Sequence, residues 1–95
     1  MLFHGFDRVM FCTVDDLARW LTELTGDDHG IVRGTASLSF DWGTLVVETE
    51  PLPPRRIALL RMRQLRVRFV PSPGAEARAQ AWIEGFDHHT QRGGG

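Results

Sequence analysis

The sequence predicts an α+β protein built as a two-layer sandwich, with the element order β-α-β-β-β-α. Two segments, one near each end of the chain, repeat apolar residues at the spacing of an amphipathic helix. The segments between them alternate apolar and polar residues, as strands with one buried face do. Short turn sequences separate these strands, so we expect a mainly antiparallel sheet with the two helices on one face.

Length and composition narrow the class of protein. The 95 residues are enough for one domain and too few for two, so we expect a single α+β domain over residues 1–92 and a disordered glycine tail over 93–95. The chain is 42% hydrophobic and 24% charged with a net charge of −1, which is typical of a soluble globular protein. All of its basic residues are arginine, a bacterial-like composition that we attribute to a GC-rich genome.

The expected location follows from three further observations. No apolar run approaches the roughly 20 residues that span a bilayer, and the first residues lack the pattern of a secretory signal. We therefore expect no membrane partner. The single cysteine, Cys12, cannot form an internal disulfide, which makes a reducing, cytoplasmic compartment the expected location.

The first strand and the first helix have clear local signals. An apolar, β-prone run predicts a strand over residues 8–12. Helical periodicity then predicts a helix over about residues 14–25. Thr13 stands at the N-cap, two aspartates follow in the first turn, and Gly26 is placed to end the helix in a left-handed conformation.

Two strands joined by a tight turn are expected next. Period-two alternation predicts a half-buried strand from Ile31 to Phe40. The turn Asp41-Trp42-Gly43 follows, with Gly43 supplying the positive φ that hairpin turns require. The next strand, over residues 44–50, is expected to end at Pro51-Leu52-Pro53-Pro54, because proline cannot continue a ladder of hydrogen bonds.

Residues 57–70 leave two interpretations open. Apolar residues at odd positions from 65 to 69 indicate a strand, whereas Leu60 and Met62 are apolar at even positions. The alternation therefore slips near Arg63-Gln64. A bulge there would make one long strand, and a turn there would make two.

A second helix is expected after Pro71-Ser72-Pro73-Gly74, with Ser72 as N-cap and Pro73 at the first helical position. Histidines and Arg92 stand at its end, where the helix dipole favours cations. The apolar positions of all these elements are expected to form one core, made of Leu17, Leu21, Leu24, Leu38, Phe40, Val47, Val67, Phe69, Trp82, Ile83 and Phe86.

The chain has no motif that indicates catalysis, so we predict no catalytic residue, no cofactor and no metal site. Phosphate loops, nucleophile elbows and zinc-protease motifs are all missing from the sequence. Cys12 precedes a helix, a position that can activate a thiol, but the neighbouring aspartates oppose a thiolate; we expect a structural cysteine. The loop Asp27-Asp28-His29 offers three ligand types without a metal-site pattern, so we interpret it as a solvated loop.

The charge distribution is the most uneven feature. Residues 51–70 contain six arginines and no acid, namely Arg55, Arg56, Arg61, Arg63, Arg66 and Arg68. A basic strand of this kind can follow a phosphate backbone. The aromatic platform of single-strand binders is missing, however, and the acidic strand with Glu48 and Glu50 precedes it. We expect Arg66 or Arg68 beside Glu48, on a face neutralised within the chain.

From these features we expect a small non-enzymatic domain that works through protein–protein contact, including self-association as a homodimer. An uncovered sheet face and free strand edges favour such contacts. Trp42 and Leu52 are the candidate partner-binding residues, provided that the chain brings the hairpin tip and the proline-rich segment together. One alternative is nucleic-acid or polyanion binding through the six arginines, which we disfavour. The other is a small ligand-binding or enzymatic module that uses the open sheet face.

Overall fold

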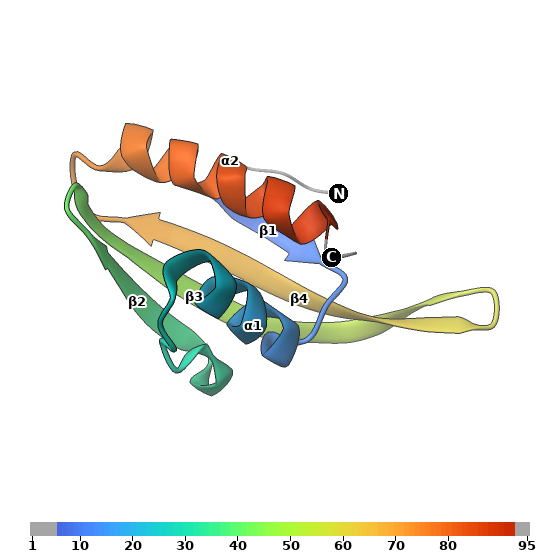
Figure 1. Ribbon diagram of the computed structural model, residues 1–95. Coiled ribbons are helices and arrows are strands. Elements are labelled where there is room, and N and C mark those ends of the chain that lie inside the picture. The colour runs from blue at the N-terminus through green and yellow to red at the C-terminus, as the bar shows by residue number, and fades with distance from the viewer. Residues whose placement is uncertain (1–5, 93–95) are drawn as a thin grey trace.

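The computed structural model describes residues 6–92, so the expected glycine tail over 93–95 lies outside the described part. Within it, one four-stranded sheet with the strand order β1-β4-β3-β2 carries two helices, and every neighbouring pair of strands is antiparallel (Figure 1). The predicted α+β two-layer fold is therefore confirmed. The elements are β1 (Asp7–Met10), α1 (Val14–Thr25), the 3-10 helix η1 (Ile31–Arg33), β2 (Thr35–Phe40), β3 (Gly43–Ile57), β4 (Leu60–Pro71) and α2 (Glu76–Arg92).

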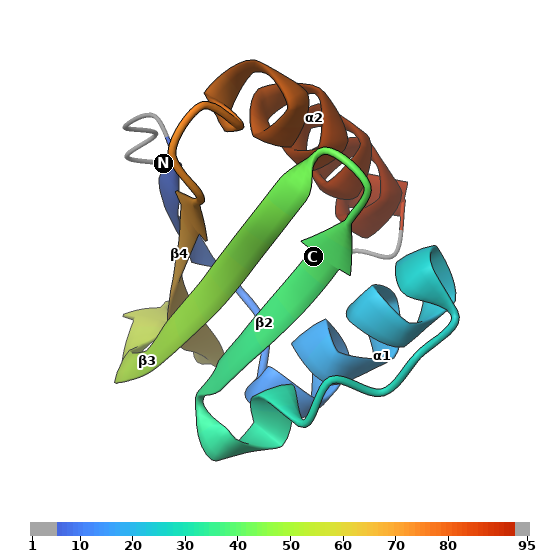
Figure 2. The same ribbon diagram turned by 90° about the vertical axis from the view of Figure 1, so that its left-hand side faces the viewer.

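Both helices lie on the same side of the sheet and enclose the core (Figure 2). All eleven predicted core residues belong to the core cluster, although Leu24, Phe40 and Trp82 are only partly buried. The opposite side of the sheet, which we call the open face, is not covered by either helix. Further buried core residues that the prediction missed are Met10, Cys12, Trp20, Ile31, Ala36, Leu45, Leu65 and Ala79.

Helix α1 has the predicted bounds and the predicted caps. The Thr13 hydroxyl accepts a hydrogen bond from the Asp16 N–H, and the Asp16 carboxylate accepts one from the Thr13 N–H, which makes a reciprocal capping box. At the other end Gly26 adopts φ 82° and donates its N–H to the Thr22 carbonyl over 2.7 Å. Local sequence signals are therefore sufficient to define this helix.

The second strand begins later than predicted. Residues Ile31–Arg33 form η1 instead of strand, and β2 starts at Thr35. Gly30 and Gly34 flank η1 with φ values of 69° and 106°, which only glycine adopts freely. The resulting turn buries the side chain of Ile31. Because an alternating strand also begins with a buried apolar residue, the sequence pattern predicted a strand that starts too early. The first strand also ends earlier, at Met10 instead of residue 12.

Ser72 does not cap the second helix, which begins at Glu76 and not directly after Pro73. The Ser72 hydroxyl instead accepts a hydrogen bond from the Thr44 N–H over 3.1 Å, and the Ser72 N–H donates to the Thr44 carbonyl over 2.8 Å. Gly43, with φ 145°, lies against this contact, because a Cβ added there would be 2.7 Å from the Ser72 hydroxyl oxygen. Ser72 thus joins the end of β4 to the start of β3.

The prediction that the prolines end β3 is wrong, since the strand continues to Ile57. The Thr49 N–H points away from β4, toward Gly34. By strand alternation the backbone nitrogens of Pro51 and Pro53 face the same way. No strand among the described residues pairs with β3 on that side, so the missing N–H groups cost no ladder bond. Pro54 has the opposite parity, and a bulge removes it from the ladder, because the register shifts between Leu52 and Arg55.

The turn between β3 and β4 lies at a position that neither interpretation of residues 57–70 predicted. The turn between β3 and β4 lies at Ala58 and Leu59, and β4 continues without interruption past Arg63 and Gln64. The bulge lies on the other strand, opposite Arg63. Leu60 and Met62 thus keep even parity and point to the open face, so the slip in the pattern marks the point where β4 leaves the core.

Candidate interaction surface

The distal half of the β3–β4 hairpin projects from the sheet as a two-stranded arm, which we define as residues 52–64 (Figure 1). Strand β2 pairs with β3 only as far as Glu48, and β1 pairs with β4 only from Leu65 onward. The projection gives the molecule a longest dimension of 46 Å. Because a two-stranded ribbon alone is at best marginally stable in water, an arm of this length suggests a surface that a partner covers.

The two faces of the arm differ in chemistry. The pairs Arg55–Met62 and Ile57–Leu60 share the parity of the open face, and Leu52 joins them at the base of the arm. The pair Arg56–Arg61 has the opposite parity, together with Arg63. The arm is therefore amphipathic. Its open-face side is formed by Leu52, Arg55, Ile57, Leu60 and Met62, and its basic side by Arg56, Arg61 and Arg63.

Apolar side chains near the tip of the arm are unusually exposed. Ile57 is 44% exposed and Leu60 67% exposed, and Leu59 in the turn is fully exposed. Val70, which has the same parity on the body of the sheet, is exposed as well. Neighbouring exposed apolar side chains, such as Ile57, Leu59 and Leu60 at the tip, typically mark an interaction site, whereas scattered apolar residues do not. The sequence contained a signal for it, namely the even-numbered apolar residues of β4.

The six arginines predicted as one group divide into two sets. Arg66 lies opposite Glu50 with a 3.7 Å ion pair, and Arg68 lies opposite Glu48 and pairs with Asp7 at 3.3 Å. The predicted acidic neighbours of this pair are thus present. The other four arginines are exposed on the arm, and within residues 6–92 none of them forms an ion pair: Arg55, Arg56, Arg61 and Arg63.

The two predicted partner-binding residues lie at opposite ends of β3. Trp42 is half-buried at the β2–β3 turn, with its ring stacked on Phe40 at 4.5 Å and 6°. Leu52 is half-buried at the base of the arm. The extended strand between them holds them roughly 30 Å apart, so the chain does not bring the hairpin tip and the proline-rich segment together. The partner role of each residue stays a prediction.

A cavity of about 480 Å³ lies between the base of the arm and the start of α1. Its lining includes Arg61 and Arg63 as well as Asp15, and the nearby helix terminus is already capped by Thr13. These opposed charges do not converge on one kind of ligand. The lining residues are Cys12, Thr13, Val14, Asp15, Pro51, Leu52, Pro54, Arg61, Arg63, Gln64 and Leu65.

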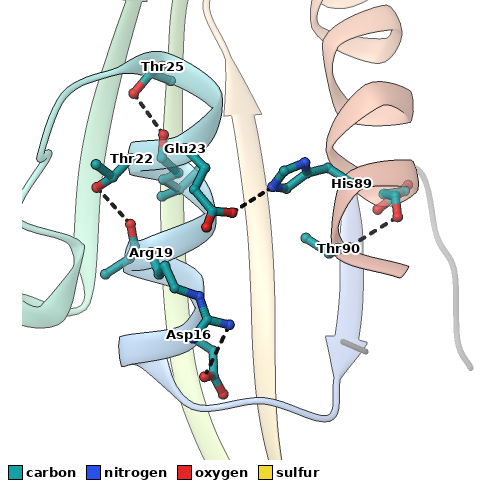
Figure 3. A network of polar contacts seen from close by, with 10 residues as sticks. Asp16, Arg19, Thr22, Glu23, Thr25, His89 and Thr90 are labelled. Carbon is teal, nitrogen blue, oxygen red and sulfur yellow. Dashed lines mark hydrogen bonds and ion pairs between the residues drawn. The ribbon is translucent and has the colours of Figure 1, made fainter. Parts of the chain in front are cut away.

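The candidate chemical groups outside the arm have structural partners. Cys12 is buried, as predicted, and burial together with Asp16 raises the pKa of its thiol to about 11. His89 of α2 contacts Glu23 of α1 at 2.8 Å, which links the two helices (Figure 3). Among the residues described, no group of three or more histidine, cysteine, aspartate or glutamate side chains is arranged to hold a metal ion.

Comparisons of the chain with protein-family models, with curated proteins and with solved structures found no match. Over residues 6–92 no helix has the length and apolar character needed to cross a membrane. The candidate site therefore rests on the geometry of the arm.

Proposed function

We propose that this chain is a non-enzymatic protein–protein interaction domain, and that the β3–β4 arm is its binding element. The observation that carries the proposal is the exposure of Ile57, Leu59 and Leu60 on an arm that projects beyond the sheet. Burying such side chains against a partner removes apolar area from water, at about 25 cal/mol per Å². The buried thiol of Cys12, whose pKa is raised to about 11, supports a reducing, cytoplasmic location for this contact.

The backbone of the arm offers a second way to bind protein. Past Thr49, whose N–H donates to the Gly34 carbonyl, β3 pairs with no strand on its outer side within residues 6–92, and neither strand of the arm pairs with a further strand there. Unpaired strand edges accept extended segments of other chains by strand addition. The three prolines of β3 reduce this capacity along its own edge, so the side-chain surface contributes more than the edge does.

Nucleic-acid binding is the second candidate, and one observation favours it: the four arm arginines form no ion pair within residues 6–92. Two-stranded ribbons enter DNA grooves in several protein families. The apolar side chains of the arm argue against this candidate, because they lie on the face opposite Arg56 and Arg61 and would stay exposed beside a phosphate backbone.

Site-specific photo-crosslinking in cells tests the proposal. A photoreactive amino acid replaces Leu60 on the arm, and in a matched control it replaces Val32, an exposed apolar residue on η1. We expect protein adducts from position 60 and none from position 32. Adducts at position 60 that nuclease removes would establish the second candidate instead. Equal labelling from both positions, or none from position 60, would contradict an interaction through the arm.

A further inference from the structure

We propose that the partner of the arm is a second copy of this chain, bound face to face through the open faces of the two sheets. This inference rests on the proposed function and names its partner. In such a dimer the arm of each copy packs on the body of the other. The two-fold axis lies between the two sheets and is perpendicular to the strands. Each uncovered sheet face is then covered, and packing of two sheets in this way is common in proteins.

The presence of apolar side chains at both ends of the open face is the first support. The side chains of Leu52, Met62 and Leu60 have the same parity as Val46 and Val70 on the body, because β4 runs through both parts without a bulge. The body of the open face therefore offers apolar side chains of its own, one of which, Val70, is exposed. An arm laid on this surface finds apolar contacts that its own chain does not provide.

One pair of opposite charges on the open face supports a defined register. Within residues 6–92, the side chains of Arg55 and Glu48 take part in no ion pair or hydrogen bond. Both point to the open face, because the bulge adds one residue between them. They lie roughly 20 Å apart along β3. A two-fold axis that crosses β3 near Leu52 places Arg55 of each copy over Glu48 of the other.

The charge distribution on the open face decides between two ways of pairing. The open-face side of the arm has Arg55 and no acid, whereas the body of the open face has three acids, Asp7, Glu48 and Glu50, beside Arg66 and Arg68. Two arms packed only on each other would bring Arg55 of one copy near Arg55 of the other. An arm packed on the body of the other copy opposes unlike charges instead, which favours association and fixes its orientation.

Sedimentation equilibrium of the full chain, over about a hundredfold range of concentration, measures this association. We expect the wild type to form a dimer. Arg55→Glu and Glu48→Arg each place like charges across the interface twice, so each should weaken the dimer at least about tenfold. An equimolar mixture of these two variants should restore a dimer, because both charge pairs are then complementary. Arg78→Glu on the exposed side of α2 is the matched control and should change nothing.

Several outcomes would overturn the second copy as partner. They are a monomeric wild type at the highest concentration, an Arg78→Glu variant as impaired as Arg55→Glu, or a mixture that fails to restore the dimer. Circular dichroism spectra of the variants, all at exposed positions, would check that they are folded. A monomer whose position 60 crosslinks to a different protein, or to nucleic acid, contradicts the homodimer. Crosslinking to a different protein would still agree with a protein–protein interaction domain, whereas crosslinking to nucleic acid would establish nucleic-acid binding instead.

Discussion

Arg8 on β1 and Asp87 on α2 form an ion pair that joins the first strand of the sheet to the last helix. The Arg8 side chain is only 2% exposed, and its guanidinium carbon also lies 5.2 Å from the centroid of the Phe69 ring. Asp87 is 29% exposed at the margin of the core. A charged group thus occupies an inward position of β1, where alternation alone would place an apolar residue.

Because Arg8 is buried and Asp87 is partly exposed, removing one partner should change the stability by a different amount from removing the other. Asp87→Ala removes a carboxylate that contacts a buried guanidinium, and we expect it to lower the free energy of unfolding by about 3–5 kcal/mol. Arg8→Met replaces the buried charge with an apolar chain and leaves a carboxylate that water can reach, so its cost should be smaller. Urea unfolding of both variants measures the difference. An equal or reversed order would contradict the burial of Arg8.

Trp82 connects the aromatic part of the core. Its ring lies 5.5 Å from Phe40, 6.3 Å from Phe69 and 5.9 Å from Phe86, measured between centroids. We expect Trp82→Ala to cost about 3–5 kcal/mol of stability, which is much of what a small domain has. His88→Ala, at an exposed position of the same helix, is the control and should stay within about 0.5 kcal/mol. An unchanged unfolding midpoint for Trp82→Ala would refute the two-layer packing.

Trp42→Ser distinguishes packing from partner contact at the β2–β3 turn. Because the ring stacks on Phe40, we expect a loss of stability that includes about 0.5–1.5 kcal/mol for the ring pair. The dimer should persist, because the Trp42 ring packs against the core, on the side of the sheet opposite the open face. Sedimentation combined with thermal unfolding checks both parts. Lost association with unchanged stability would instead make Trp42 the partner-binding residue.

Cys12 makes the stability of the protein depend on pH, and a single substitution can test this dependence. The chain has no lysine and no tyrosine, so Cys12 is the side chain that titrates between pH 9 and 11. Since burial and Asp16 raise the pKa of the native thiol from 9.0 to about 11, the unfolded state loses its proton first. The contribution of Cys12 to stability should therefore be unchanged until the pH nears 9, and stability should fall as the pH rises from 9 toward 11. Cys12→Ala should abolish this fall, and a fall that persists in the variant would contradict the assignment.

The chain should not bind nucleic acid tightly. Arg66 and Arg68 are paired with acids, and the arm presents only three arginines on its basic side. Fluorescence anisotropy with a labelled duplex at physiological salt should show no submicromolar affinity. Binding that is lost when Arg56, Arg61 and Arg63 become alanine, and kept when Arg66 and Arg68 do, would establish the polyanion function.

Local signals in the sequence predicted the structure correctly where a segment determines its own conformation. Thr13 and Gly26 define both ends of α1, and odd-numbered apolar residues define the inner side of β4. The strand order was not predictable, because it depends on which edges meet after folding. Ser72 shows the same limit: its hydroxyl serves Thr44, a residue far away in the sequence, in preference to the adjacent helix.

The arm was missed because two general rules gave the opposite answer there. Prolines normally end a strand, but β3 continues past Pro51 since its outer edge pairs with no strand beyond Thr49 within residues 6–92. Non-glycine residues normally avoid positive φ, yet Ala58 adopts 55° in the turn. Apolar residues normally point inward, and Leu60 points outward. Each departure falls in the segment that we assign to binding.

Hydrogen exchange of the arm at two protein concentrations tests the central claim most directly. A free two-stranded arm should exchange its amide hydrogens rapidly, whereas an arm covered by a second copy should be protected. We predict that protection of residues 52–64 increases with protein concentration while protection of α1 stays constant. Fast exchange of the arm that is the same at both concentrations would contradict the account.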